Sequence, residues 1–418
     1  MKLICNTNYV SHARKEENMA YLTGKTEQGC STLGILKDGY IVCAPDVPER
    51  IIKQGKTNTW HMWYAKVVGE IGEKVKIKLE WPKYDKSKVD PELLKNPNFE
   101  LDWECFITCA RDIVFASTDR INWNRIENVE IVGNSLVFEY ELEATECRLT
   151  VLYYYTVEMF RNLLEFSSKN EYIKTEIIGK DMGGDEIYAF TVTDFSVPDT
   201  EKKAMFFMGQ QHVSENNGSH MCDLMMRFLA SDDEKAAELR KKYVVYFVPV
   251  ASVTSWREGL DTHLTIDINP NRDWEKMELP TTKAIHNWLE ARKPAPTFLL
   301  DIHSGLANYG RWDICQAIST NPDKTDKDYE REHRFADLVY EECSFLPTRR
   351  YWDDFPVSAT NFDGYAKRYG QAQTMEISHY AMYDREAGKH FPIDKKGLER
   401  FARQLLPICD KLISEEQK

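Results

Sequence analysis

From Val157 onward the chain alternates short apolar runs with segments of helical spacing, and this alternation is the feature that most constrains its fold. The apolar runs have the length and composition of buried strands, and they occupy residues 186–193, 204–209, 243–250 and 298–302. Segments with helical spacing surround them, at residues 159–166, 221–230, 328–343 and 398–412. Apolar strands that alternate with helices predict an α/β fold, with a mixed, mostly parallel sheet flanked by helices.

The first 155 residues have a different pattern, with short runs rich in aromatic and β-branched residues and little helical spacing. Residues 61–69 and 74–82 look like two strands of one hairpin, and the Gly-Asn pair at 133–134 predicts the turn of a second hairpin. Several short antiparallel strands at this spacing favour an all-β sandwich. We therefore predict a sandwich domain over residues 1–155 and an α/β domain over residues 156–418.

Composition excludes several classes of partner. The formal net charge of -13 disfavours nucleic acid, because phosphate binding requires clustered Lys and Arg. The sequence contains no run of about 18 apolar residues, so we predict no membrane helix. The first residues turn polar too soon for a signal peptide. The 10 cysteines form no Cys-x-x-Cys pair, so we expect reduced thiols and a cytoplasmic protein. The sequence gives no indication of the oligomeric state.

The loop between the apolar run ending at Gly209 and the next helix contains His212 and Glu215. Such loops lie at the carboxyl ends of strands, where ligands collect in α/β sheets. An imidazole and a carboxylate three residues apart can both bind one metal ion. The pair is weak on its own, since a chain with 10 His and 67 acidic residues can contain it by chance, and a solvated loop is the alternative.

A third metal ligand is expected at His303, where a buried strand ends in a turn of small residues. Two histidines and one glutamate leave a fourth position open for water, which is the pattern of a hydrolytic zinc site. We therefore predict one Zn²⁺ ion per chain, bound by His212, Glu215 and His303. His220 is the spare imidazole nearby, and we expect it on a helix surface.

Three further segments carry candidate catalytic or substrate-binding groups. Asn271 and Arg272 form an amide beside a guanidinium, which suits a terminal carboxylate, although a surface salt bridge is the alternative. Arg257 follows an apolar strand and is a candidate for stabilising oxyanion charge. Glu376 lies in an apolar, strand-like segment, and a buried carboxylate there is a candidate general base acting on metal-bound water.

The order of these motifs resembles the zinc carboxypeptidases of the M14 type over roughly residues 157–418. Residues 178–188 are similar to the entry strand of that family, and residues 117–125 with 153–156 look like the β-domain junction of its cytosolic carboxypeptidase branch. The resemblance implies hydrolysis of the carboxy-terminal amide bond of peptides or proteins, with Glu376 assisting attack by the zinc-bound water.

The chain departs from the family pattern at several positions. Asn269 stands where many relatives have an Asp that supports a zinc-bound histidine, and Asp267 is a possible substitute. The position of a lid tyrosine is open, and the candidates are Tyr351, Tyr365 and Tyr369. We take Tyr365 as the substrate-binding candidate.

Counting back from Glu376 places Asn361 at the family's side-chain pocket. A neutral Asn there, with basic residues close in sequence, favours a substrate whose terminal residue is polar or acidic. The alternative is that the basic residues lie on a solvated loop and contact no substrate. The basic residues are Arg349, Arg350, Lys367 and Arg368.

Two other functions remain open at this point. An amidohydrolase for cell-wall peptides or N-acyl amino acids would use the same site. A non-catalytic binding protein on this scaffold predicts a lost metal ligand or a lost Glu376, and the sequence shows neither loss.

Overall fold

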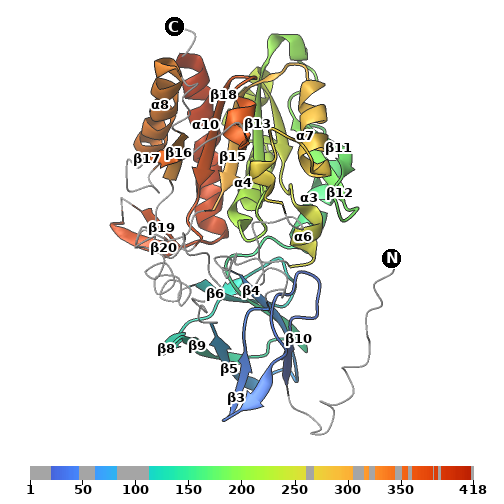
Figure 1. Cartoon of the computed structure of the whole chain (residues 1–418), viewed down its shortest axis with the longest axis vertical. Helices are drawn as coiled ribbons and strands as arrows, with labels where there is room; N and C mark the ends of the chain where they lie inside the picture. Colours follow the sequence, from blue (N-terminus) through green and yellow to red (C-terminus); the bar gives the residue numbers. More distant parts are fainter. Residues whose placement is uncertain are drawn as a thin grey trace.

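The computed structural model describes residues 20–46, 62–81, 113–259, 268–304, 315–319, 325–343, 351–355, 360–379, 381–384 and 387–415. Figure 1 shows a β-rich body below a larger α/β body, and this arrangement confirms the predicted fold class. The expected domain boundary at residue 155 falls between β10 (Glu146–Val151) of the β-domain and α3 (Val157–Ser168), the first helix of the α/β domain. No helix in the described ranges is both long and apolar enough to cross a bilayer.

The described residues of the β-domain form two five-stranded sheets. The first has the order β1 (Tyr21–Thr23), β4 (Trp63–Val68), β10, β6 (Val114–Ser117) and β7 (Asn124–Arg125). The second has the order β2 (Ile35–Lys37), β3 (Tyr40–Cys43), β5 (Lys74–Glu80), β9 (Ser135–Glu141) and β8 (Glu130–Val132). Alternation of side chains decides the core: Val75, Ile77 and Leu79 of β5 are buried, while the lysines between them are not.

One of the two expected hairpins is wrong. β4 and β5 do not pair, because β4 lies between β1 and β10 in the first sheet and β5 lies between β3 and β9 in the second. A short turn can join two neighbouring strands of one sheet, and it can equally join two strands in opposite sheets of a sandwich. The apolar pattern does not show which strand each one pairs with. The second hairpin is confirmed, since β8 and β9 pair with Val132 opposite Ser135, and Gly133 in the turn has φ +64°.

The α/β domain has an eight-stranded mixed sheet. Its order is β11 (Ile173–Lys180), β12 (Glu186–Val192), β14 (Tyr243–Val248), β13 (Lys203–Gly209), β15 (Pro296–His303), β18 (Gln371–Glu376), β16 (Cys315–Ser319) and β17 (Tyr351–Phe355). The four strands from β14 to β18 run parallel. β13 and β14 are buried almost throughout, as continuous apolar strands covered on both faces must be.

Helices cover both faces of this sheet. The helices besides α3 are α4 (Asn216–Leu229), α5 (Glu234–Lys242), α6 (Val253–Arg257), α7 (Pro280–Glu290), α8 (Asp326–Glu342), α9 (Phe362–Ala366) and α10 (Lys395–Glu415). On β18, Gln373 donates to the Glu332 carbonyl of α8, and its neighbour Thr374 donates to Asp363 of α9. Because consecutive residues of a strand point to opposite faces, α8 and α9 lie on opposite faces. α10 packs against both α4 and α8.

Six cysteines whose side chains the structure describes are buried. They are Cys30, Cys43, Cys147, Cys222, Cys343 and Cys409.

Candidate metal centre and catalytic site

Three neighbouring parallel strands end at the same edge of the sheet and deliver the candidate residues. β13 leads into the loop with His212 and Glu215, β15 ends at His303, and β18 ends at Glu376. The strand register places His303 directly opposite Glu376. The carboxyl edge of a parallel sheet therefore collects four residues from three segments that are far apart in sequence.

Close backbone packing fixes the loop after β13. A Cβ at Gly209 would lie 2.4 Å from the Gly218 carbonyl carbon, and one at Gly218 would lie 2.3 Å from the Ile302 oxygen. Only glycine allows β13, the first turn of α4 and β15 to approach so closely. Within the loop, Gln210 Nε2 donates to the Val213 carbonyl at 2.9 Å. The positions of His212 and Glu215 are thus set by the main chain.

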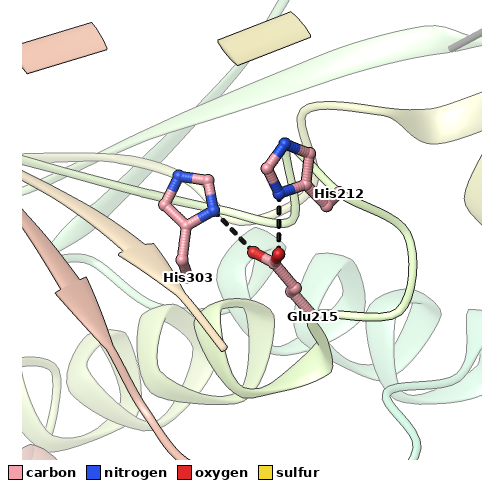
Figure 2. A group of neighbouring side chains, drawn as sticks. All are labelled: His212, Glu215 and His303. Carbon is pink, nitrogen blue, oxygen red and sulfur yellow. Dashed lines mark hydrogen bonds and ion pairs between the residues drawn. The ribbon is translucent and has the colours of Figure 1, made fainter. Parts of the chain in front are cut away.

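His212, Glu215 and His303 form one buried cluster, with candidate ligand atoms within 4.8 Å of one another. Figure 2 shows both imidazole rings directed at the Glu215 carboxylate. The distance from His212 Nδ1 to Oε1 is 2.7 Å, and that from His303 Nδ1 to Oε2 is 2.5 Å. The Ser304 amide also donates to Oε2, at 3.2 Å.

The far nitrogen of each ring meets an oxygen. His212 Nε2 lies 3.1 Å from Asn269 Oδ1, and His303 Nε2 lies 2.7 Å from Asp301 Oδ2. In the neutral form of each ring these oxygens favour a proton on Nε2, which leaves the Nδ1 lone pair facing Glu215, as is typical of metal-binding histidines. A carboxylate facing two such lone pairs needs a cation or extra protons between them. Two nitrogen donors and one carboxylate fit a zinc ion.

Asp301 and Gln211 belong to the contacts of this cluster, and sequence reasoning missed both. Asp301 is fully buried, and Gln211 donates to the same oxygen that holds His303. Burial lowers the pKa of His303, but the carboxylates of Asp301 and Glu215 outweigh it and hold the pKa well above its usual value. The signal was present in the sequence: residues 301 and 303 are two apart on a strand, so their side chains share one face.

Glu376 is a buried carboxyl group beside the cluster. Its Oε2 has no hydrogen-bond partner among the described residues. Burial raises the pKa of Glu376 to about 8, the charges of Glu215 and Asp301 add to the rise, and His303 opposes it. A carboxyl group with a pKa near neutrality is suited to both accepting and donating a proton.

Asn271 and Arg272 lie in η6 (Pro270–Arg272), and the structure gives them different surroundings. Asn271 is buried, with Nδ2 at 3.2 Å from His303 Nε2 and Oδ1 accepting from the Phe362 amide at 3.0 Å. Arg272 is exposed and donates to the Asn271 carbonyl, and no carboxylate of the described residues pairs with it. Burial of part of the guanidinium lowers the pKa of Arg272.

Arg257 lies at the end of α6 with an ion pair as its main contact. Its Nε donates to Asp185 at 2.9 Å, and this hydrogen bond raises the pKa of Arg257. The side chain is 41% exposed. The expected oxyanion role therefore competes with a structural one, in which Arg257 ties α6 to the turn before β12.

The pocket candidates lie around α9. Asn361 is buried, and its Nδ2 has no partner within the described ranges. Tyr365 is also buried, its hydroxyl lies 2.6 Å from His286 Nδ1 and 2.9 Å from the Tyr369 hydroxyl, and its ring packs against Trp274. These contacts fix the Tyr365 side chain in the protein interior.

The remaining pocket candidates contribute less. Arg368 donates to the Tyr365 carbonyl and stacks on the Tyr365 ring. Asp267, Arg349 and Arg350 lie outside the described residues, as does the side chain of Tyr351.

The expectation for His220 is wrong. The residue is 5% exposed, its ring stacks on Tyr153, and it donates to the Tyr153 carbonyl at 3.2 Å. Burial lowers the pKa of His220 to about 3, so the ring is neutral. The helical pattern of α4 did not reveal this because the covering residues come from the junction with the β-domain.

Residues 162–296 match the family model of the zinc carboxypeptidases. That segment contains His212, Glu215 and the Asn271-Arg272 pair, and it ends where β15 begins. Cytosolic carboxypeptidase 2 of Danio rerio is 26% identical over 135 residues, which make up 29% of this chain and 19% of that protein. The alignment thus spans less than a fifth of this relative.

Solved structures are similar over nearly the whole chain. A metallo-carboxypeptidase from Burkholderia cenocepacia has a TM-score of 0.73 at 15% identity and covers 95% of this chain and 100% of its own. A metallo-carboxypeptidase from Pseudomonas aeruginosa, in complex with (2-guanidinoethylmercapto)succinic acid, has a TM-score of 0.74 at 17% identity, covering 94% and 99%. The fold, β-domain included, is that of these metallo-carboxypeptidases.

Proposed function

We propose that this protein is a zinc-dependent carboxypeptidase that hydrolyses the carboxy-terminal amide bond of peptides or proteins. The observation that carries the proposal is the buried cluster of His212, Glu215 and His303 with the Glu376 carboxyl group beside it. Zinc bound by these three ligands would act as a Lewis acid on the scissile carbonyl and on water. We further propose that the protein works in the cytoplasm, a compartment that suits buried cysteine thiols.

Glu376 moves the proton in this scheme. Its unpartnered Oε2 takes a proton from the attacking water and passes it to the nitrogen of the leaving amine. The raised pKa supports this assignment, because a stronger base than an ordinary carboxylate removes a proton from water more readily. The positive charge of a bound cation opposes the rise and brings the pKa down toward the working pH.

Arg272 binds the carboxylate at the end of the substrate. A partly desolvated guanidinium without a described acidic partner gains from a carboxylate placed on it. Asn271 lies beside it, but both ends of its amide contact the protein, so Arg272 provides the main contact with substrate.

The terminal residue removed is polar or acidic in this proposal. The support is Asn361, a buried residue at the start of α9 whose side-chain Nδ2 has no partner among the described residues. A side-chain oxygen of the substrate would accept a hydrogen bond from this Nδ2. Arg368 adds little, because its guanidinium is turned onto the Tyr365 ring.

Two measurements test the function. Purified protein should contain one zinc ion per chain, and it should cleave a peptide with a free carboxyl terminus much faster than the same peptide amidated at that end. Equal cleavage of both peptides, or full activity after complete removal of metal, would show that the proposal is wrong.

A further inference from the structure

The segment that joins the two domains lies along helix α4. This linker, residues 152–156, connects β10 to α3. The Tyr155 amide donates to Asn216 Oδ1 at 3.0 Å, His220 donates to the Tyr153 carbonyl, and the Tyr155 hydroxyl donates to Asp223 at 3.0 Å. Asn216, His220 and Asp223 are four and three residues apart, so they form one face of α4. The linker therefore holds the first half of the helix at three points.

Gln28 of the β-domain holds the linker from the other side. Its Nε2 donates to the Tyr155 carbonyl at 3.3 Å, and its Oε1 accepts from the Val157 amide at 2.8 Å. Gln28 is fully buried and has φ +64°, a backbone conformation that is unfavourable for a residue other than glycine. Strained, buried residues persist where the surroundings fix them, and they concentrate at functional positions.

Helix α6 completes this contact. The Gln28 amide donates to the Arg257 carbonyl at 2.9 Å, and Trp256 Nε1 donates to the Tyr155 carbonyl at 2.8 Å. A Cβ at Gly259 would lie 2.4 Å from the Gln28 oxygen, so the glycine allows the β-domain to approach. The Tyr155 carbonyl thus receives donors from both domains.

On the metal side, Asn216 directly follows the ligand Glu215. Its Oδ1 accepts from Tyr155 and, at 3.3 Å, from Gln210 Nε2, while its Nδ2 donates to the Ser214 carbonyl at 3.0 Å. One side-chain amide therefore joins the linker to both ends of the metal-binding loop.

We propose that the β-domain positions the metal centre, and that Gln28 is a positioning residue acting through the linker and Asn216 on Glu215. Gln28 fixes Tyr155, Tyr155 fixes the first turn of α4, and that turn carries the carboxylate that both histidines face. The inference rests on the zinc site proposed above, and it assigns the β-domain a role in assembling that site.

The test measures zinc affinity without substrate, by competition with a chromogenic chelator. Gln28→Leu keeps the size of the side chain but removes its hydrogen bonds to the linker, and it should weaken zinc binding roughly 10-fold, at the lower end of the effects known for groups that orient metal ligands. The matched control is Ile77→Ala, which removes a fully buried side chain from β5 in the second sheet of the β-domain. This control should lower the melting temperature and leave zinc affinity at the wild-type value.

A double-variant cycle separates positioning from general destabilisation. Asn216→Ala should weaken zinc binding at least as much as Gln28→Leu, and the double variant should lose no more than Asn216→Ala alone, because both act along one chain of contacts. If Gln28→Leu does not fold, His220→Phe takes its place, since it keeps the stacking on Tyr153 and removes the hydrogen bond.

The outcomes are distinct. Wild-type zinc affinity in Gln28→Leu, or losses that add in the double variant, would overturn the positioning role. A wild-type protein that binds no zinc would instead contradict the proposed zinc site.

Discussion

His303 and Glu376 are register partners at the ends of two adjacent parallel strands, and the Ile377 amide donates to the His303 carbonyl at 3.0 Å. A candidate metal ligand and a candidate proton carrier are therefore fixed relative to each other by the sheet itself. Sites built on strands hold their geometry better than sites built on loops. This relationship makes the role of Glu376 separable from metal binding.

Glu376→Gln should abolish most turnover and retain the zinc. The amide has the shape of the carboxyl group but cannot accept and return a proton, so we expect kcat to fall roughly 100- to 10,000-fold. Metal content and kcat measured on the same preparation check this. Near-normal turnover in the zinc-loaded variant would rule out the proton-carrying role.

The zinc-free protein should become less stable as pH rises toward 8 because of Glu376. Its pKa of about 8 in the folded protein lies above its ordinary value of 4.5. Between these values the unfolded chain has released a proton that the folded protein keeps, so raising the pH favours unfolding, by up to ~1.4 kcal/mol per pH unit.

Urea unfolding of the zinc-free wild type and of Glu376→Gln, from pH 5 to pH 8, measures this effect. The difference between the two proteins isolates Glu376 from His303 and the other groups. We expect the variant to gain stability relative to the wild type as pH rises, and parallel curves would contradict the raised pKa.

Removal of Asp301 charge should weaken the metal site without removing a ligand. Asp301→Asn leaves an oxygen for His303 Nε2 but takes away the negative charge that holds the ring, so zinc affinity should fall roughly 10- to 100-fold. His303→Ala is the comparison, and it should lose more because it removes a ligand. Chelator competition gives both values, and an unchanged affinity in Asp301→Asn would show that its buried charge does not support the ligand.

Much of the site could be predicted because its parts lie on continuous apolar strands. The runs before His212, His303 and Glu376 identify strand ends, and parallel strands bring their ends to one edge. The sequence does not reveal contacts between distant segments. Arg257 pairs with Asp185, which lies in the turn between β11 and β12. His220 is buried by tyrosines from the domain junction.

Arg257→Ala and Asp185→Asn together decide between the two roles of Arg257. If the guanidinium stabilises the oxyanion, Arg257→Ala should lower kcat strongly while Asp185→Asn has little effect. If the ion pair fixes α6, both changes should lower the melting temperature and affect kcat similarly, because each removes one charge of the same ion pair. We expect the exposed pair itself to contribute about 1 kcal/mol or less to stability.

Arg272→Ala should remove the preference for a free carboxyl terminus. The guanidinium carries a charge-assisted contact to the terminal carboxylate in our proposal, so kcat/KM on the free peptide should fall roughly 10- to 100-fold. The amidated peptide should be cleaved no worse than by the wild type. Equal losses on both peptides would argue against an exopeptidase and for a structural role of Arg272.

The residue removed from the substrate should be polar or acidic, and Asn361 should decide it. Its buried Nδ2 lacks a described partner, so a terminal residue with a side-chain oxygen gains a hydrogen bond that an apolar residue cannot provide. A panel of peptides that differ only in the last residue should rank Glu, Gln or Asn above Leu and Phe. Asn361→Leu should reverse this order, because it replaces the donor with an apolar surface of similar size and leaves the zinc ligands in place. A clear preference of the wild type for terminal Lys, Arg or Phe would overturn the assignment of the pocket while leaving the metal centre untouched.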